Sequence, residues 1–184
     1  MNKYDMLAIA LSPTTVSVVT VLSVLGVHNN AVDWIIAILS LVVGPVLPVI
    51  LLAALRKTDL SVTDQAQRTP LLMLAVLNYF LGFYFFHLRG NRNMEFVTLS
   101  YGIVTVGVAA INAFYTKGSV HMAGIAGPST LLILLGMKEG VFLLFLIPLV
   151  AWVRLKTKAH TGHQIIVGGF VAVILTILAY LILF

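Results

Sequence analysis

The stretch RLKTKAHTGHQ, residues 154–164, is the most polar run between two strongly apolar segments near the C-terminus. It places Arg154 and His160 six positions apart, and Gln164 follows four positions later. Because the apolar segments on both sides are predicted to be membrane-spanning helices, this run is expected to form a loop at a membrane surface. The rest of the chain is then a scaffold that holds this loop and two other polar loops at one surface.

The amino-acid composition is that of a membrane protein. Hydrophobic residues make up 60% of the 184 positions and charged residues only 9%, whereas a soluble domain carries about 25% charged residues. The length suits one compact bundle, so we expect a single domain over residues 1–184, embedded in the cell membrane as a multi-pass protein. The absence of cysteine excludes disulfides, thiolate nucleophiles and sulfur-rich metal sites.

Seven apolar segments predict an all-α, polytopic transmembrane helix bundle with about seven spans. A spanning helix needs about 20 mostly apolar residues, and fewer where protein shields it. Pro70 is expected to be the first residue of the third helix, where its missing N–H costs nothing. Gly44-Pro45 and Pro48 predict a kink in the second helix. The predicted spans are residues 7–27, 32–55, 71–88, 96–115, a helix from about residue 121, 141–153 and 165–184.

Three polar loops, at residues 56–70, 116–121 and 154–164, are predicted to share one face of the membrane. Two helices separate each loop from the next, and an even number of spans returns the chain to the same side. An excess of cations normally marks the cytoplasmic side. Cations that bind phosphate do not report topology, so the sequence leaves the side open. The shared face carries eight of the eleven basic residues: Lys3, Arg56, Lys57, Arg68, Lys117, Arg154, Lys156 and Lys158.

The shared face is rich in cations and histidines and poor in carboxylates. Its three loops contain His121, His160 and His163, with carboxylates only at Asp59 and Asp64. Fixed cations without a carboxylate cage fit an oxyanion such as phosphate and do not fit a divalent metal. Histidine can attack phosphorus or act as a general acid near neutral pH, and guanidinium groups can stabilise a transferring phosphoryl group. These residues therefore suggest metal-independent phosphoryl transfer through histidine, without a cofactor.

Three blocks in these loops resemble the motifs of the type 2 phosphatidic acid phosphatase superfamily of membrane lipid phosphatases, which are K-x6-RP, PSGH and SR-x5-H-x3-D. The third block has Arg154, His160 and Gln164 at the family's spacing, with Gln where the family has Asp. The second block, residues 118–121, reads GSVH and keeps Ser and His. In the first block, within residues 57–70, ten residues separate Lys from Arg and a Thr precedes Pro.

The resemblance implies a role for each matching residue. His160 would be the nucleophile that forms a phosphohistidine, and His121 would protonate the leaving alkoxide. Gln164 replaces an Asp that would orient the imidazole and stabilise its positive charge, so slower turnover is expected. The residues expected to bind phosphate are Lys57, Arg68, Ser119 and Arg154.

The residues and the resemblance together favour an integral membrane phosphatase that hydrolyses a lipid phosphate or a polyprenyl phosphate or diphosphate. The expected partners are this substrate and membrane lipids, and no nucleic acid; the sequence leaves homo-oligomerisation open. One alternative is a catalytically weak or inactive member of the same fold that binds lipid phosphate, which Gln164 suggests. Another is a small transporter, although no charged residue falls mid-span in the later helices, where an ion path would place one.

Overall fold

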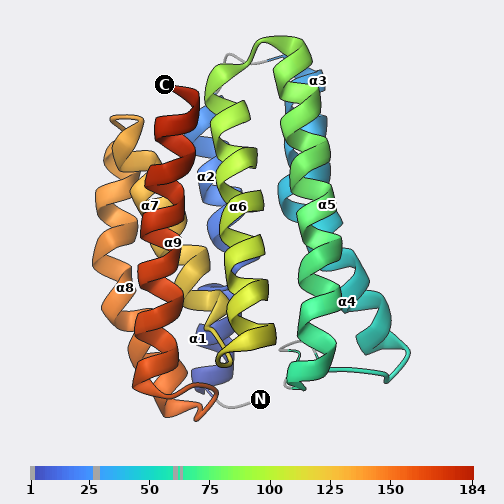
Figure 1. Ribbon diagram of the computed structural model, residues 1–184, viewed down its shortest axis with the longest axis vertical. Helices are drawn as coiled ribbons and strands as arrows, with labels where there is room; N and C mark the ends of the chain where they lie inside the picture. Colours follow the sequence, from blue (N-terminus) through green and yellow to red (C-terminus); the bar gives the residue numbers. More distant parts are fainter. Residues whose placement is uncertain (1–2, 27–29, 60–61, 63) are drawn as a thin grey trace.

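The computed structural model describes residues 3–26, 30–59, 62 and 64–184, and it is an all-α helix bundle, as the sequence predicts (Figure 1). Several of these helices are long and apolar enough to cross a membrane, so the chain is a membrane protein. The elements in chain order are α1 (Lys3–Ala10), α2 (Pro13–Leu25), α3 (Ala31–Ala37), the π-helical segment η1 (Ile38–Val43), α4 (Gly44–Ala54), α5 (Gln65–Arg89), α6 (Arg92–Phe114), α7 (Val120–Leu134), α8 (Lys138–Lys156) and α9 (Gly162–Leu183).

These elements form seven rods that run between the two ends of the bundle (Figure 1). α1 and α2 make the first rod; α3, η1 and α4 make the second; each later helix is a rod of its own. In the described part of the chain, five rods are long and apolar enough to cross a membrane: 6–25, 31–54, 65–89, 92–114 and 162–183. The other two predicted spans differ, because α7 has only 15 residues and α8 carries charged residues in its first and last turns.

Two local predictions about prolines have different outcomes. α5 begins at Gln65 and not at Pro70, because the Asp64 side chain caps the helix by accepting from the Ala66 N–H at 2.9 Å. The prediction of a helix start at Pro70 is therefore wrong, and Arg68 belongs to the helix instead of the loop. A π-helical segment, η1, ends directly before Gly44, and the kink expected at Gly44-Pro45 and Pro48 stays a prediction.

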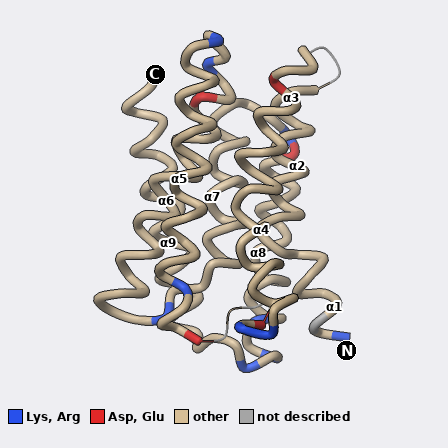
Figure 2. The backbone as a smooth tube through the Cα atoms, turned by 90° about the vertical axis from the view of Figure 1, so that its right-hand side faces the viewer, with Lys and Arg blue, Asp and Glu red and all other residues tan. Residues whose placement is uncertain are grey.

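The connections that contain the three polar runs lie at the same end of the bundle, as predicted. The run 154–164 is a loop only at residues 157–161, because α8 continues to Lys156 and α9 begins at Gly162. The α4–α5, α6–α7 and α8–α9 connections lie at the lower end in Figure 1, together with the start of α1. The α5–α6 and α7–α8 turns and the C-terminus lie at the upper end. Lys, Arg, Asp and Glu gather toward the two ends, which leaves the middle of the bundle without these charged residues (Figure 2). The lower end is called the motif end below, and the upper end is called the opposite end.

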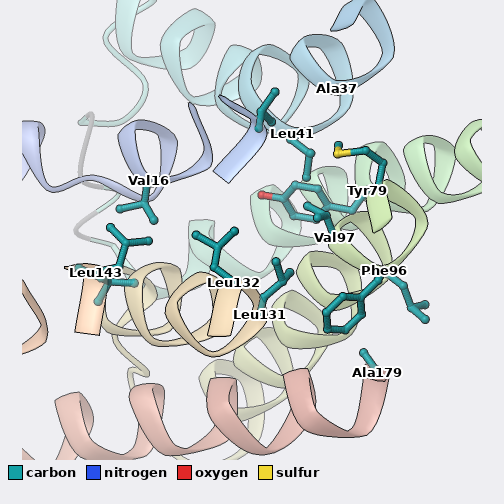
Figure 3. Packing of buried hydrophobic residues seen from close by; sticks show 14 of the residues in the cluster. Val16, Ala37, Leu41, Tyr79, Phe96, Val97, Leu131, Leu132, Leu143 and Ala179 are labelled. Atoms are coloured by element: carbon teal, nitrogen blue, oxygen red, sulfur yellow. The ribbon is translucent and has the colours of Figure 1, made fainter. Parts of the chain in front are cut away.

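Large apolar side chains fill the interior where α5 to α9 meet (Figure 3). Phe96 is fully buried and its ring packs edge-on against Tyr180 of α9, with 5.5 Å between ring centroids. The outer surface is apolar as well: Ile166, Phe170 and Leu181 of α9 are each more than 60% exposed. Such a surface is unfavourable in water and suits a lipid environment. Other fully buried side chains include Phe86, Met94, Val97, Ile125, Leu131 and Leu132.

Candidate active site

A cavity of about 960 Å³ extends from the motif end into the middle of the bundle. Residues of α1, α2, α4, α5, α6 and α7 form its walls, and the loop after α8 closes part of its outer end. At the outer end, its lining contains the polar residues Arg68, Lys117, His121, Arg154 and His160. Each of the three predicted motif blocks thus contributes at least one cation or histidine to one cavity.

His160 lies in the loop between α8 and α9, and only 6% of its surface is exposed. Its Nδ1 lies 3.2 Å from the carbonyl oxygen of Lys117 and 3.3 Å from Oε1 of Gln164. Both partners are carbonyl oxygens and can only accept; the contact of Oε1 with the Thr161 N–H at 3.1 Å fixes which amide atom is the oxygen. Nδ1 therefore carries the proton and donates it. The lone pair of the neutral ring is on Nε2.

The surroundings of His160 keep its ring neutral. Burial is the largest cause and, together with the nearby charges of Arg68, Arg154 and Lys117, lowers the pKa of His160 to about 4. The hydrogen bond with Gln164 acts in the opposite direction and does not overcome this. At neutral pH, Nε2 is consequently unprotonated, which is the state that a nucleophile requires.

Gln164 holds the imidazole and joins two of the loops. Its Oε1 accepts from the Thr161 N–H, while the Thr161 hydroxyl accepts from the Gln164 N–H, so the pair forms a capping box at the start of α9. Its Nε2 donates to the Thr116 hydroxyl at 3.3 Å. The amide therefore makes the hydrogen bond to His160 that a carboxylate would make, but it brings no negative charge.

Two buried arginines face the cavity beside His160. Arg68 is 6% exposed and Arg154 is 4% exposed. Arg68 Nε donates to the carbonyl oxygen of Val62 at 2.7 Å. Arg154 Nε has no hydrogen-bond partner among the residues that the structure describes. Because a buried cationic donor without a partner is unfavourable, an oxyanion in the cavity would stabilise this arrangement.

Asn112 anchors the start of α5 and so positions Arg68. It is buried near the end of α6. Its Nδ2 donates to the Thr69 hydroxyl at 2.9 Å, and its backbone carbonyl oxygen accepts from Gln65 Nε2 at 2.8 Å. Sequence reasoning missed this residue, since a lone Asn near the end of an apolar segment gives no signal of a contact 43 residues away.

Lys117 of the α6–α7 connection and His121 of the first turn of α7 also line the cavity. His121 is the second residue of α7, and its ring is hydrogen-bonded to the backbone of Ala8 in α1. Burial, together with the charges of Arg68 and Arg154, lowers the pKa of Lys117. Sequence reasoning did not include Lys117 among the residues expected to bind phosphate. The structure places it in the cavity, and its position two residues before Ser119 was the available signal.

Two predicted phosphate-binding residues are not part of the cavity lining. Ser119 is fully buried: its Oγ accepts from the Met122 N–H at 3.3 Å as the cap of α7, and its own N–H donates to the Gln164 carbonyl oxygen at 3.3 Å. A Cβ at Gly168 would lie 2.7 Å from the Ser119 carbonyl oxygen, so α9 packs directly on this turn. Lys57 is exposed to solvent just after α4. The structure thus gives Ser119 a structural contact and leaves Lys57 outside the cavity.

Comparisons of the chain with protein-family models, with curated proteins and with solved structures gave no match. Within the described residues, no group of three or more His, Asp or Glu side chains is arranged to hold a metal ion. The function of the protein is therefore inferred from the geometry of the cavity and from the residues of the three motif blocks.

Proposed function

We propose that the protein is an integral membrane phosphatase of the cell membrane, related to the type 2 phosphatidic acid phosphatase superfamily, which removes phosphate from a lipid. The observation that carries this proposal is the state of His160. Two carbonyl oxygens hold its Nδ1–H, and its free Nε2 lies among buried cations at the mouth of a largely apolar cavity. This combination suits attack on a phosphorus atom whose oxygens are bound by guanidinium groups.

In the first step, Nε2 of His160 attacks phosphorus and a P–N bond forms while the P–O bond to the lipid breaks. Nδ1 keeps its proton throughout. Arg68 and Arg154 bind the phosphoryl oxygens, where negative charge is concentrated. Burial, together with the charges of Arg154 and His160, lowers the pKa of His121 to about 3, and the negative charge of the bound phosphate acts in the opposite direction and favours its imidazolium form. The leaving alkoxide takes a proton from this imidazolium. The lipid alcohol is then released.

In the second step, water attacks the phosphohistidine. Neutral His121 takes a proton from this water, the P–N bond breaks, and inorganic phosphate leaves with the electron pair of the bond returned to Nε2. The phosphorylated ring of His160 is positively charged between the steps, and the amide of Gln164 adds no charge to offset it. We therefore expect slower turnover than a carboxylate at this position would give.

The size and the walls of the cavity support a lipid substrate. A water molecule occupies about 30 Å³ of the liquid, so the cavity has the volume of about thirty waters and exceeds what free phosphate needs. Ile9 of α1 and Ile50 of α4 line the cavity and are 52% and 47% exposed. No extensive packing of α1 against α4 is found among the described residues. A lipid could therefore enter sideways from the bilayer between these helices.

A second candidate function is binding of lipid phosphate without hydrolysis. It is favoured by one observation, the neutral side chain of Gln164 where the intermediate needs negative charge. In that case the cations and His160 would hold the phosphate group, and no P–N bond would form.

The test is release of inorganic phosphate from a panel of lipid phosphates by the purified protein and by His160→Ala. Phosphatidate, phosphatidylglycerophosphate, polyprenyl phosphate and polyprenyl diphosphate cover the expected classes. His163→Ala is the matched control, because His163 is exposed, bonds Tyr115 at 3.2 Å and is not among the cavity-lining residues. We expect wild type and His163→Ala to release phosphate and His160→Ala to release none. Binding of these lipids without release by wild type would favour the second candidate.

A further inference from the structure

The inner end of the cavity contains two buried hydroxyl groups that the proposed chemistry does not use. Ser100 of α6 is 2% exposed and Thr176 of α9 is fully buried, and both line the cavity. Ser100 Oγ and Thr176 Oγ1 have no hydrogen-bond partner in the described part of the chain. Burying an unpaired hydroxyl is unfavourable, so these two oxygens need an explanation.

Seven other hydroxyls of this protein behave differently. A Ser or Thr inside a helix commonly donates to the carbonyl oxygen four residues earlier. Ser100 and Thr176 make no such bond, although both lie within helices, so their hydroxyls are available to the cavity. The hydroxyls that do donate to that carbonyl belong to Ser17, Thr20, Ser23, Ser40, Thr98, Thr130 and Thr157.

The two hydroxyls lie at the same level of neighbouring helices. Phe96 and Tyr180 are in ring contact between α6 and α9, and Ser100 and Thr176 are each one turn further into the bundle. Figure 3 shows the adjacent core, with Phe96 beside Ala179 and with Leu131 and Tyr79 nearby. A Cβ at Gly127 of α7 would lie 3.4 Å from Thr176 Oγ1, so α7 forms a third close wall. The result is a small hydrogen-bonding pocket within an apolar interior.

This pocket is far from the phosphate end of the cavity. On α5, Arg68 marks the phosphate end and Tyr79, near the pocket, follows eleven positions later. On α9, Gln164 marks the phosphate end and Thr176 follows twelve positions later. At 1.5 Å per residue, these separations correspond to about 16 and 18 Å. An extended chain advances about 1.2 Å per bond, so about 13 to 15 bonds of a hydrocarbon chain would join the two ends.

We propose that this inner end is a second binding site, which takes a neutral hydroxyl group carried on the hydrocarbon chain of a lipid phosphate about 13 to 15 bonds from phosphorus. The ligand hydroxyl donates to one of Ser100 and Thr176 and accepts from the other, because each protein hydroxyl can do both. A plain hydrocarbon chain leaves both hydroxyls unpaired. A charged group would find no opposite charge here. The inference rests on the proposed function for the placement of the phosphate near His160.

The test compares two ligands that differ by one hydroxyl, octadecyl phosphate and 12-hydroxyoctadecyl phosphate. Each competes with a fluorescent lipid phosphate for the purified protein in lipid nanodiscs. We expect wild type to bind the hydroxylated lipid about fivefold more tightly, the effect of one net hydrogen bond. In Ser100→Ala/Thr176→Val this preference should disappear, while the affinity for octadecyl phosphate stays within about twofold. Thr130→Val is the matched control, because its hydroxyl donates to the Ala126 carbonyl oxygen at 2.8 Å, and it should keep the preference.

Equal binding of the two lipids by wild type, or a preference that persists in the double variant, would overturn the proposal. If the double variant does not fold, a positional series on wild type decides alone. The preference must be present for a hydroxyl at carbon 12 and absent for one at carbon 6, and a preference independent of position contradicts the site. Because this test measures binding and not hydrolysis, its result can contradict the second binding site without contradicting the phosphatase function, and the reverse. A preference without any phosphate release overturns only the phosphatase function, and release without a preference overturns only the second site.

Discussion

The two ends of the bundle use the same kinds of charged residue in opposite ways. At the opposite end, Arg89 pairs with Asp33 and Arg92 lies 3.1 Å from Glu95 Oε2, and both carboxylates are buried. Asn91 Nδ2 also donates to Asp33 at 3.1 Å. These contacts tie α3 to the α5–α6 turn. Cations with buried carboxylate partners act here as structural connections.

At the motif end, Arg68 and Arg154 are themselves buried and lie near enough to Lys117 to lower its pKa. Among the described carboxylates, that of Asp59, which is exposed to solvent, acts on Arg68 and Lys117. Mutual repulsion of buried cations is unfavourable unless an anion is bound between them. The two ends therefore differ in the surroundings of their cations. The cations of the opposite end have buried carboxylate partners, as structural cations do, whereas the buried cations of the motif end lie near one another, as cations of an anion-binding site do.

The largest expected effect is on catalysis at the motif end. Arg154→Ala should lower the rate of phosphate release by about 10³-fold, because it removes a donor to the transferring phosphoryl group. Its thermal stability should stay close to that of wild type, since Arg154 Nε has no hydrogen-bond partner to lose among the described residues. Phosphate release and thermal unfolding of the purified variant check both parts. A large loss of stability with unchanged release per folded molecule would mean that Arg154 is structural.

The reciprocal change at the opposite end should affect folding and not catalysis. Arg89→Ala leaves the buried Asp33 carboxylate without its cation, which should destabilise the protein by about 2 kcal/mol, below the range for fully buried pairs because Arg89 is partly exposed. Phosphate release per folded molecule should be unchanged. Denaturant unfolding and the same release assay measure the two quantities. Loss of release without loss of stability would break the distinction between the ends.

The pH dependence of phosphate release should reflect the environment of His160. Its pKa is lowered from the ordinary 6.5 to about 4, so the nucleophile stays unprotonated at all pH values above about 4. The acidic limb of kcat/KM that belongs to this group should therefore lie near pH 4, with activity falling as pH decreases through that value. A histidine limb near pH 6.5 that disappears in a variant of His160 would contradict the lowered pKa.

The smallest expected effect concerns Gln164. Gln164→Asp and Gln164→Glu each add a carboxylate beside Nδ1 of His160, which should stabilise the charged intermediate and speed phosphate release by about tenfold. The same charge should raise the pKa of His160 and move the acidic limb to higher pH. Single-turnover and steady-state rates distinguish a faster second step from altered binding. Unchanged or slower release in both variants would show that a carboxylate is not what this position lacks.

Most of the fold follows from the sequence because hydropathy reports on the bilayer directly. The order of the rods and the shared face of the three loops needed only the apolar segments and an even number between loops. The start of α5 was missed because Pro70 is an obvious helix-start signal, whereas the Asp64 cap depends on a local hydrogen bond. The shortness of α7 was missed as well, since its small residues gave no clear end.

The site was predictable where a residue belonged to a spaced motif, as for Arg154, His160 and Gln164. It was not predictable where burial decides. Ser119 matches a motif position, but the packing of α9 against its backbone keeps it out of the cavity lining. Lys117 matches no motif position, yet the fold of its loop brings it close enough to both arginines for their charges to lower its pKa. Such contacts between distant segments leave no periodic pattern in a single sequence.

The most direct test of the account is detection of a covalent phosphoryl group on His160. Wild type would be mixed with a lipid labelled in its phosphate, quenched in base within milliseconds, and digested for mass spectrometry. We expect an acid-labile, base-stable phosphoryl group on the peptide that contains His160, with none in His160→Ala and with full labelling in His163→Ala. Hydrolysis by wild type with no label on His160, or with the label on another residue, would contradict the central claim.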